Sequence, residues 1–240
     1  MPASVALRHS LTRTIEQSTW GRSLTPSQLA RVLETASERP VAAGEWVFQV
    51  GDPAEHWLGV IDGVLTMQVG APDGRISTLT GVGRGAWFGE GSLLRHGPFR
   101  YGVVALSASR VAQVPRAVFE QLRQTSLPFN HHLQHLMNAR LGLFIGLLQT
   151  DRLLDADARV AHCLASLYNP DLYPDPGPRL NFSQGEVALL AGLSRQRANA
   201  ALQRLAAAGL IELHSRGMSV RDLDGLRRWG SAPGAADAPG

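Results

Sequence analysis

The spacing of apolar residues along the chain changes character twice in its first half. Residues 1–39 have the pattern of interrupted helices, and Pro26 opens one of them. From Val41 onward, short segments rich in valine, leucine and aromatic residues alternate partly with polar ones, which predicts β-strands. These segments are separated by glycine-containing turns and cover residues 45–50, 56–69, 75–82 and 103–114. No helical segment lies between them, so the pattern favours a closed or sandwiched antiparallel sheet over a parallel α/β fold.

Helical spacing returns near Arg116 and is most regular from Asn130 to Gln149, where two apolar stripes lie side by side. One stripe is enough to pack a helix on its own domain, so the second favours contact with another chain. We therefore expect a dimerisation helix; the alternative is a helix buried within one chain. The residues expected at the dimer interface are Leu133, Met137, Leu141, Phe144 and Leu148.

The C-terminal third begins with another expected helix at Asp155, followed by a proline-rich loop over residues 169–180. Ser183 and Glu186 then have the spacing of a capping box, which starts a short helix. A turn at Gly192 follows this helix. Residues 231–240 form a low-complexity tail that is too poor in apolar residues to order itself.

Ser194 is placed to cap a second helix, whose buried face carries Ala198, Leu202 and Leu205. Gly209 is well placed just after the end of this helix. Two capped helices joined by a glycine turn are typical of a helix–turn–helix, and the hairpin that follows predicts a wing.

The outer face of this second helix carries the side chains that could contact DNA. Arginine can bind guanine, and glutamine or asparagine can bind adenine, each through two hydrogen bonds in the major groove. Five arginines and two glutamates lie between Ser183 and Arg221, so the positive charge is local to this segment. The expected DNA-binding residues are Ser183, Ser194, Arg195, Gln196, Arg197, Asn199, Gln203 and, at the tip of the wing, Arg216.

Composition narrows the class of protein. The 240 residues are 44% hydrophobic and carry a net charge of only +3, which fits a globular chain with no membrane span. No secretory signal is evident, so we expect a cytoplasmic protein without a membrane partner. The single Cys163 leaves no internal disulfide and no cysteine-ligated iron–sulfur cluster within one chain.

Taken together, these segments resemble the family of bacterial regulators that contains the cAMP receptor protein and the fumarate–nitrate reduction regulator. The resemblance runs from about residue 25 to 222 and includes the segment Trp87–Leu94 and the helix from Asp155. It implies an α+β fold with an N-terminal antiparallel β-roll over residues 1–128. It further implies a long dimerisation helix over 129–152, a winged helix–turn–helix over 153–229 and a tail over 230–240.

By this resemblance, the protein is a homodimeric transcription regulator that binds double-stranded DNA at an inverted repeat, with RNA polymerase as a candidate partner. A ligand-dependent repacking of the long helix would re-aim the recognition helices through a hinge near Asp151–Asp155. In the family pocket, a Gly-Glu pair precedes an Arg-Ser or Arg-Thr pair that holds the sugar and phosphate of a cyclic nucleotide. The implied effector-pocket residues are Gly89, Glu90, Ser92, Arg100, Tyr101 and Phe144.

The pocket departs from the family pattern at Tyr101, which replaces a small hydroxyl residue, and at Phe144, which has no polar atom. We therefore expect a small-molecule effector other than cAMP. Glu90 and Arg100 could instead form a structural ion pair. The alternatives are a regulator that responds to cAMP or another cyclic nucleotide, and a ligand-free regulator whose pocket is filled by its own side chains. A regulatory subunit of an enzyme or channel is a third.

Other chemistry is poorly supported. His131, His132 and His135 have a spacing that could bind a metal, but no nearby carboxylate or cysteine completes a set, so a solvated helix start is expected. Cys163 is expected to be a core residue rather than a redox sensor. The glycines around Gly85 lack the Lys-Ser/Thr of a phosphate-binding loop. We predict no enzyme activity.

Overall fold

The computed structural model describes residues 2–70, 76–153, 155–174, 179–180, 182–215 and 217–230, with side chains described from Ser10 onward except at 149–153. The chain divides into two compact units. The first unit comprises Met1–Leu141 and Pro170–Asp175, and the second comprises Gly142–Asn169 and Pro176–Gly240. The boundary therefore lies inside a helix, and a short piece of the C-terminal half joins the N-terminal unit.

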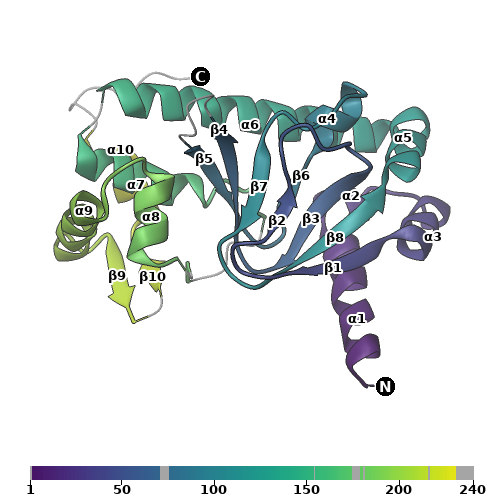
Figure 1. Cartoon of the computed structure of the whole chain (residues 1–240), viewed down its shortest axis with the longest axis horizontal. Helices are drawn as coiled ribbons and strands as arrows, with labels where there is room; N and C mark the ends of the chain where they lie inside the picture. The colour runs from purple at the N-terminus through teal and green to yellow at the C-terminus, as the bar shows by residue number, and fades with distance from the viewer. Residues whose placement is uncertain are drawn as a thin grey trace. The chain divides into compact units, whose positions relative to one another are not determined.

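The first unit is built on two four-stranded antiparallel sheets (Figure 1). One sheet has the order β1-β8-β3-β6, from strands Ser37–Val41, Ser109–Pro115, His56–Asp62 and Trp87–Phe88. The other has the order β2-β7-β4-β5, from strands Trp46–Phe48, Gly102–Ala105, Leu65–Gly70 and Ile76–Val82. The expected antiparallel sheet is confirmed, but the expectation that no helix lies between its strands is wrong, because the short helix α4 (Glu90–Leu94) lies between β6 and β7. Strand structure begins at Ser37 rather than Val41, because residues 37–41 pair with β8.

Helices surround the roll. They are α1 (Pro2–Gln17), α2 (Thr19–Arg22), α3 (Pro26–Thr35), α4 (Glu90–Leu94), α5 (Arg116–Thr125) and the start of α6 (Leu127–Leu153). The start of α3 follows from its sequence: Thr25 and Gln28 form a capping box around Pro26. Helix α5 begins differently, because Pro115 precedes it without a side-chain capping hydrogen bond.

The core of this unit is aromatic. Trp20, Trp57 and Trp87 contact one another, with ring centroids 4.6 to 4.9 Å apart, and Phe129 at the start of α6 packs against the same group. These four side chains are almost completely buried. Burial of such large apolar surfaces supplies much of the stabilisation that holds α2 and α6 to the sheets.

The second unit contains the end of α6 and the C-terminal elements. These are α7 (Ala156–Ser166), α8 (Gln184–Leu190), α9 (Arg195–Ala207), β9 (Ile211–His214), β10 (Gly217–Val220) and α10 (Leu223–Arg228). Asp155 caps α7 through hydrogen bonds from the Asp157 and Ala158 amides, as expected. Strands β9 and β10 form an antiparallel hairpin, and Leu180 bridges to Met218 beside it. This is a winged helix–turn–helix, as the sequence predicts.

Candidate DNA-binding surface and effector pocket

Helices α8 and α9 both begin with the predicted caps. The Ser183 hydroxyl accepts a hydrogen bond from the Glu186 amide at 3.2 Å, and the Glu186 carboxylate accepts one from the Ser183 amide. Gly192 has φ +63° in the turn, and a Cβ there would meet Arg159 Nη2 at 2.8 Å. The position therefore favours glycine for both conformation and space. Ser194 caps α9 by accepting from the Arg197 amide at 3.4 Å.

An arginine that sequence reasoning did not single out for this role fixes the turn. Arg159 on α7 donates from Nη2 to the carbonyls of Ala191 and Gly192, at 2.9 and 3.3 Å. Its Nε donates to the Ala191 carbonyl at 3.2 Å. These carbonyls follow the end of α8, where backbone acceptors lack helical partners. The sequence shows that an arginine lies on α7. It does not show that this arginine faces the end of α8, because that depends on how α7 packs on α8.

Helix α9 has one buried and one exposed face. Ala198, Leu202 and Leu205 have relative exposures of 0%, so the predicted buried stripe is confirmed. The predicted contact residues Ser194, Arg195, Gln196, Arg197 and Gln203 are exposed within their unit. Asn199 differs, because it is only half-buried and its Oδ1 atom is buried. Ser183 is also exposed, at the start of α8.

The positive charge of this unit is smaller than the count of arginines suggests. Arg204, which also lies on the outer side of α9, forms two hydrogen bonds to Asp157 of α7 at 2.5 Å. Arg221 pairs with Glu212 across the hairpin. Arg195 and Arg197 form no ion pair with any residue in the described part of the chain. They are the cations that α9 can offer to a ligand. Arg216, expected at the tip of the wing, lies outside the described residues.

In the first unit, the expected effector-pocket residues lie around α4. Gly89 precedes α4 with φ +93°, and Glu90 and Ser92 are buried with 3% and 4% exposure. Arg100 is exposed and makes no ion pair with the described residues. The alternative of a structural pair between Glu90 and Arg100 is therefore wrong. Phe144 belongs to the second unit, so its place in the pocket stays a prediction.

Glu90 is paired with an arginine that the sequence analysis did not assign. Arg140 on α6 places Nε 3.3 Å from Glu90 Oε1, and its Nη2 donates to the Trp87 carbonyl at 3.0 Å. Arg140 Nη1 also lies 3.8 Å from Met67 Sδ. Glu90 Oε2 is buried without a hydrogen-bond partner among the described residues. The carboxylate that the family uses for a ligand is thus held by a cation from its own chain.

Tyr101 lies beside this pair. Burial raises its pKa, and the neighbouring Glu90 carboxylate raises it further, against smaller opposite effects from Arg140 and from a hydrogen bond of the Gly89 backbone. Burial lowers the pKa of Arg140, but Glu90 and the two tyrosines Tyr101 and Tyr173 reverse this, and the net shift is upward. Tyr101 therefore stays neutral and Arg140 charged. The pocket contains a permanent ion pair with a phenol next to it.

Tyr173 is a buried residue that the sequence analysis left in a loop. It lies in the segment Pro170–Asp175, which belongs to the first unit, and it is 4% exposed. Its hydroxyl donates to the Gly81 carbonyl at 2.6 Å and lies 3.1 Å from Thr80 Oγ1. Tyr173 thus anchors the segment after α7 on β5 of the roll. Proline-rich composition alone gives no sign of such an anchor.

The expected dimer residues on α6 separate into two groups. Leu133 is 3% exposed and packed inside the roll unit, so a partner chain cannot reach it, and its assignment to the interface is wrong. Met137, Leu141 and Leu148 are 47%, 58% and 60% exposed, and Ile145, which was not predicted, is 48% exposed. Phe144 is half-buried. The exposed apolar stripe therefore begins at Met137, and α6 continues to Leu153, so it ends within the expected hinge at Asp151–Asp155.

The remaining candidates behave as structural residues. The described ranges hold no group of three or more histidine, cysteine or acidic side chains arranged for a metal ion. His132 is not solvated as expected, because it packs against Trp57, and burial lowers its pKa to about 4. Burial raises the pKa of Cys163 to about 12, which makes its thiol unreactive at neutral pH.

Two family models match the chain in the order of its two units. Residues 38–126 match the cyclic nucleotide-binding domain, and residues 158–229 match the Crp-like helix-turn-helix domain. The CRP-like protein Clp of Xanthomonas campestris is 30% identical over 220 residues, which cover 88% of this chain and 94% of Clp. The chain belongs to the CRP/FNR family.

Other CRP/FNR proteins are similar at lower identity. A CRP-like cAMP-activated global transcriptional regulator of Mycobacterium tuberculosis is 26% identical over 206 residues, covering 85% of this chain and 92% of the relative. Among solved structures, FixK2 from Bradyrhizobium japonicum has a TM-score of 0.69 at 21% identity. That match covers 82% of this chain and 98% of FixK2, and it shows the shared fold.

This family membership settles the class of the protein. It is a CRP-like transcription regulator with a helix–turn–helix for DNA, and its relatives are not enzymes. The nucleotide-binding domain type makes a small-molecule effector possible in principle. Among the described residues, no helix combines the length and apolar character needed to cross a bilayer.

Proposed function

We propose that this regulator acts in the cytoplasm as a homodimer that binds an inverted-repeat operator, with RNA polymerase as a partner at its promoters. The observation that carries the proposal is the two-faced α9: apolar residues attach it to its unit while Arg195, Gln196 and Arg197 extend from its first turn. The first turn of a recognition helix is the part that contacts base edges.

Selection of bound sequences from a random DNA pool tests this proposal most directly. We expect an inverted repeat with half-sites centred about 10–10.5 base pairs apart, because a two-fold dimer places its recognition helices one helical turn apart. Enrichment of a single unrepeated site, or no enrichment at all, would contradict the proposed mode of binding.

The Arg195→Ala variant tests the contact residue. We expect operator binding to weaken by about 1–3 kcal/mol and the preference at one base position to relax. Arg227→Ala is a matched control, because Arg227 is an exposed arginine on α10 paired with Asp224. Titrations of labelled operator and of single-base variants would measure both effects. Equal affinities for the two variants would remove Arg195 from the base-contacting set.

The proposed dimer rests on the exposed stripe of α6. Met137, Leu141, Ile145 and Leu148 recur at spacings of four, four and three, which places them on one face of the helix. Analytical ultracentrifugation should show a dimer for the native chain and a shift toward monomer for Leu141→Glu. Ile76→Glu, at a 62% exposed residue on β5, should leave the dimer unchanged. A native chain that sediments as a monomer would contradict the proposal.

We further propose that the pocket around Glu90 is not tuned to cAMP. A ligand would have to displace Arg140 from Glu90 and accommodate the ring of Tyr101, where the family has a small hydroxyl residue. Related proteins differ in effector: the Mycobacterium relative is described as cAMP-activated, and a structure of Xanthomonas CLP as c-di-GMP responsive. Isothermal titration with cAMP should give no binding heat, and saturable micromolar binding would overturn this part.

A further inference from the structure

A second hollow in the first unit is distinct from the pocket around Glu90. It is a cavity of about 740 Å³ between the C-terminal half of α1 and the roll. Four arginines line it: Arg13, Arg22, Arg84 and Arg110. Asp62 is the one carboxylate among its described lining residues. None of the residues assigned to the Glu90 pocket takes part in this cavity.

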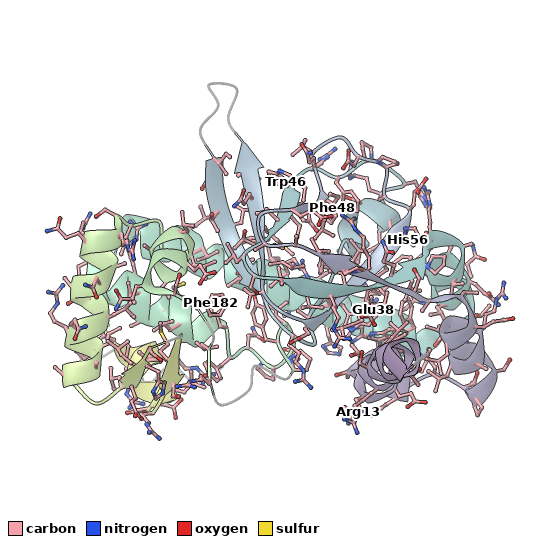
Figure 2. All side chains as sticks on the ribbon, turned by 60° about the horizontal axis from the view of Figure 1, so that its bottom comes forward. Arg13, Glu38, Trp46, Phe48, His56 and Phe182 are labelled. Carbon is pink, nitrogen blue, oxygen red and sulfur yellow. The ribbon has the colours of Figure 1, made fainter. Side chains whose placement is uncertain are left out.

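The four guanidinium groups come from four different parts of the chain. Arg13 lies on α1, Arg22 ends α2, Arg84 precedes β6 and Arg110 lies on β8. Figure 2 labels Arg13, which lies on α1, and Glu38, which lies on β1. The cluster is therefore not a row of charges along one solvent-exposed helix face. The tertiary structure brings its members together.

Two of these arginines are held in place by neighbours. Arg110 Nη1 donates to Ser10 Oγ at 2.8 Å and to Glu38 Oε1 at 3.1 Å. Arg22 donates from Nε to the Gln17 carbonyl at 3.0 Å. Both contacts orient a guanidinium while using only some of its five N–H groups. The site is therefore partly built before any ligand arrives.

The lining has an excess of positive charge. Four arginines line the cavity, against the Asp62 carboxylate in the lining and the Glu38 carboxylate beside Arg110. A concave site lined by one sign of charge concentrates oppositely charged ligands. Guanidinium groups match phosphate oxygens through paired hydrogen bonds, and the cavity volume lies in the range typical of small-molecule sites.

We propose that this cavity binds a small organic ligand carrying two or more phosphate groups, of the size of a nucleoside polyphosphate. The site would be a second input to the regulator, apart from the Glu90 pocket and from α9. Its concave shape and its mixture of arginine with Ser10 and Thr14 hydroxyls favour a compact ligand over the backbone of a duplex.

The test is isothermal titration of the full-length native protein with ATP and, separately, with inorganic pyrophosphate at low ionic strength. We expect saturable binding of ATP at one site per chain, weaker binding of pyrophosphate, and loss of both at high salt. The Arg13→Gln/Arg84→Gln variant should bind ATP at least about tenfold more weakly. The single variant Arg13→Gln should retain the fold, because Arg13 is exposed, and it should lose part of the ATP affinity that the double variant loses.

The control is Arg31→Gln/Arg123→Gln, which makes the same change in net charge on α3 and α5, away from the cavity. It should bind ATP like the native chain.

Equal losses of ATP affinity in the two double variants would indicate a general charge effect and overturn the proposal. The absence of binding by either probe would overturn it as well. If an unrelated DNA duplex displaces ATP and the cavity variant loses affinity for that duplex, the ligand is DNA backbone and the proposed ligand class is wrong. If the cavity variant selects the same operator as the native chain, failure of the cavity proposal leaves the proposed DNA-binding function intact.

Discussion

In the roll, the carboxylate of Glu90 is buried with Arg140 Nε 3.3 Å away, and Tyr101 interacts electrostatically with both groups. On α9, Arg195 and Arg197 are exposed and form no ion pair with the described residues. Both regions carry charged residues, Glu90 on the short helix α4, which the sequence did not predict, and Arg195 and Arg197 on α9, which it did. They differ in whether the charge has a partner inside the chain.

This difference separates charges that maintain the fold from charges that can act on a ligand. A buried ion pair must stay together, because either partner alone would leave an uncompensated charge in a medium of low dielectric constant. An exposed arginine is hydrated and costs little to keep unpaired. The following experiments replace residues of both kinds, beginning with the buried Arg140 and ending with the exposed Arg204.

Removal of Arg140 should have the largest effect. The Arg140→Ala variant leaves Glu90 buried without its cation, so we expect the free energy of unfolding to fall by about 3–5 kcal/mol. Urea unfolding followed by circular dichroism measures the loss. The Glu90→Gln/Arg140→Met double variant should recover much of it, because no buried charge remains. A loss below about 1 kcal/mol for Arg140→Ala would show that solvent reaches Glu90.

His132 predicts a pH dependence of stability. Burial lowers its pKa to about 4 in the folded chain, whereas an unfolded histidine has a pKa of about 6.5. Between these values the unfolded chain binds a proton that the folded chain excludes, so stability falls as pH falls. We expect a loss of about 2 kcal/mol between pH 7 and pH 5.

Urea unfolding at several pH values above the carboxylate range measures this loss. The His132→Gln variant should flatten the pH profile, while His131→Gln, at an exposed residue of the same helix, should not. An identical slope for the native chain and His132→Gln would assign the pH dependence to other groups.

The Tyr173 anchor should contribute less. The Tyr173→Phe variant keeps the buried ring but removes the hydroxyl that donates to the Gly81 carbonyl, so we expect a loss of about 1–2 kcal/mol in the free energy of unfolding. Thermal unfolding of the two proteins side by side measures it. An unchanged melting temperature would mean that water replaces the hydroxyl at the Gly81 carbonyl.

Arg204 gives the smallest expected effect. It pairs with Asp157 but is more than half exposed, and exposed ion pairs contribute little because water and salt screen them. The Arg204→Ala variant should therefore have the melting temperature of the native chain. A clear decrease would place Arg204 with Arg140 among the charges that maintain the fold.

Local sequence patterns predicted the caps and the buried faces. Ser183, Gly192 and Ser194 behave as expected because a cap or a left-handed turn involves residues only a few positions apart. The stripe of Ala198, Leu202 and Leu205 follows from helical periodicity in the same way. The antiparallel roll was predicted from strand length and glycine turns, although its pairing order was not.

Longer-range partners could not be predicted in this way. Nothing around Glu90 indicates that Arg140, fifty residues later, would neutralise it, and Arg100 had the better spacing. Leu133 shares the periodic pattern of Met137 and Leu141, but only the packing of α6 on the roll decides which of them is buried. Periodicity specifies the face of a helix and not what covers it.

The sequence by itself determined the type and order of most elements, though not of the short helix α4. It also determined the helix–turn–helix with its caps and the polar outer face of α9, because these depend on backbone preferences and on side chains within one or two turns. Only the tertiary structure decided which charges are paired. It selected Arg140 for Glu90, brought Arg159 to the turn before α9, buried Tyr173 against β5 and gathered four distant arginines around one cavity. The physical reason is that ion pairs and buried hydrogen bonds depend on distances in space, and residues far apart in sequence reach those distances only when the sheets and helices pack.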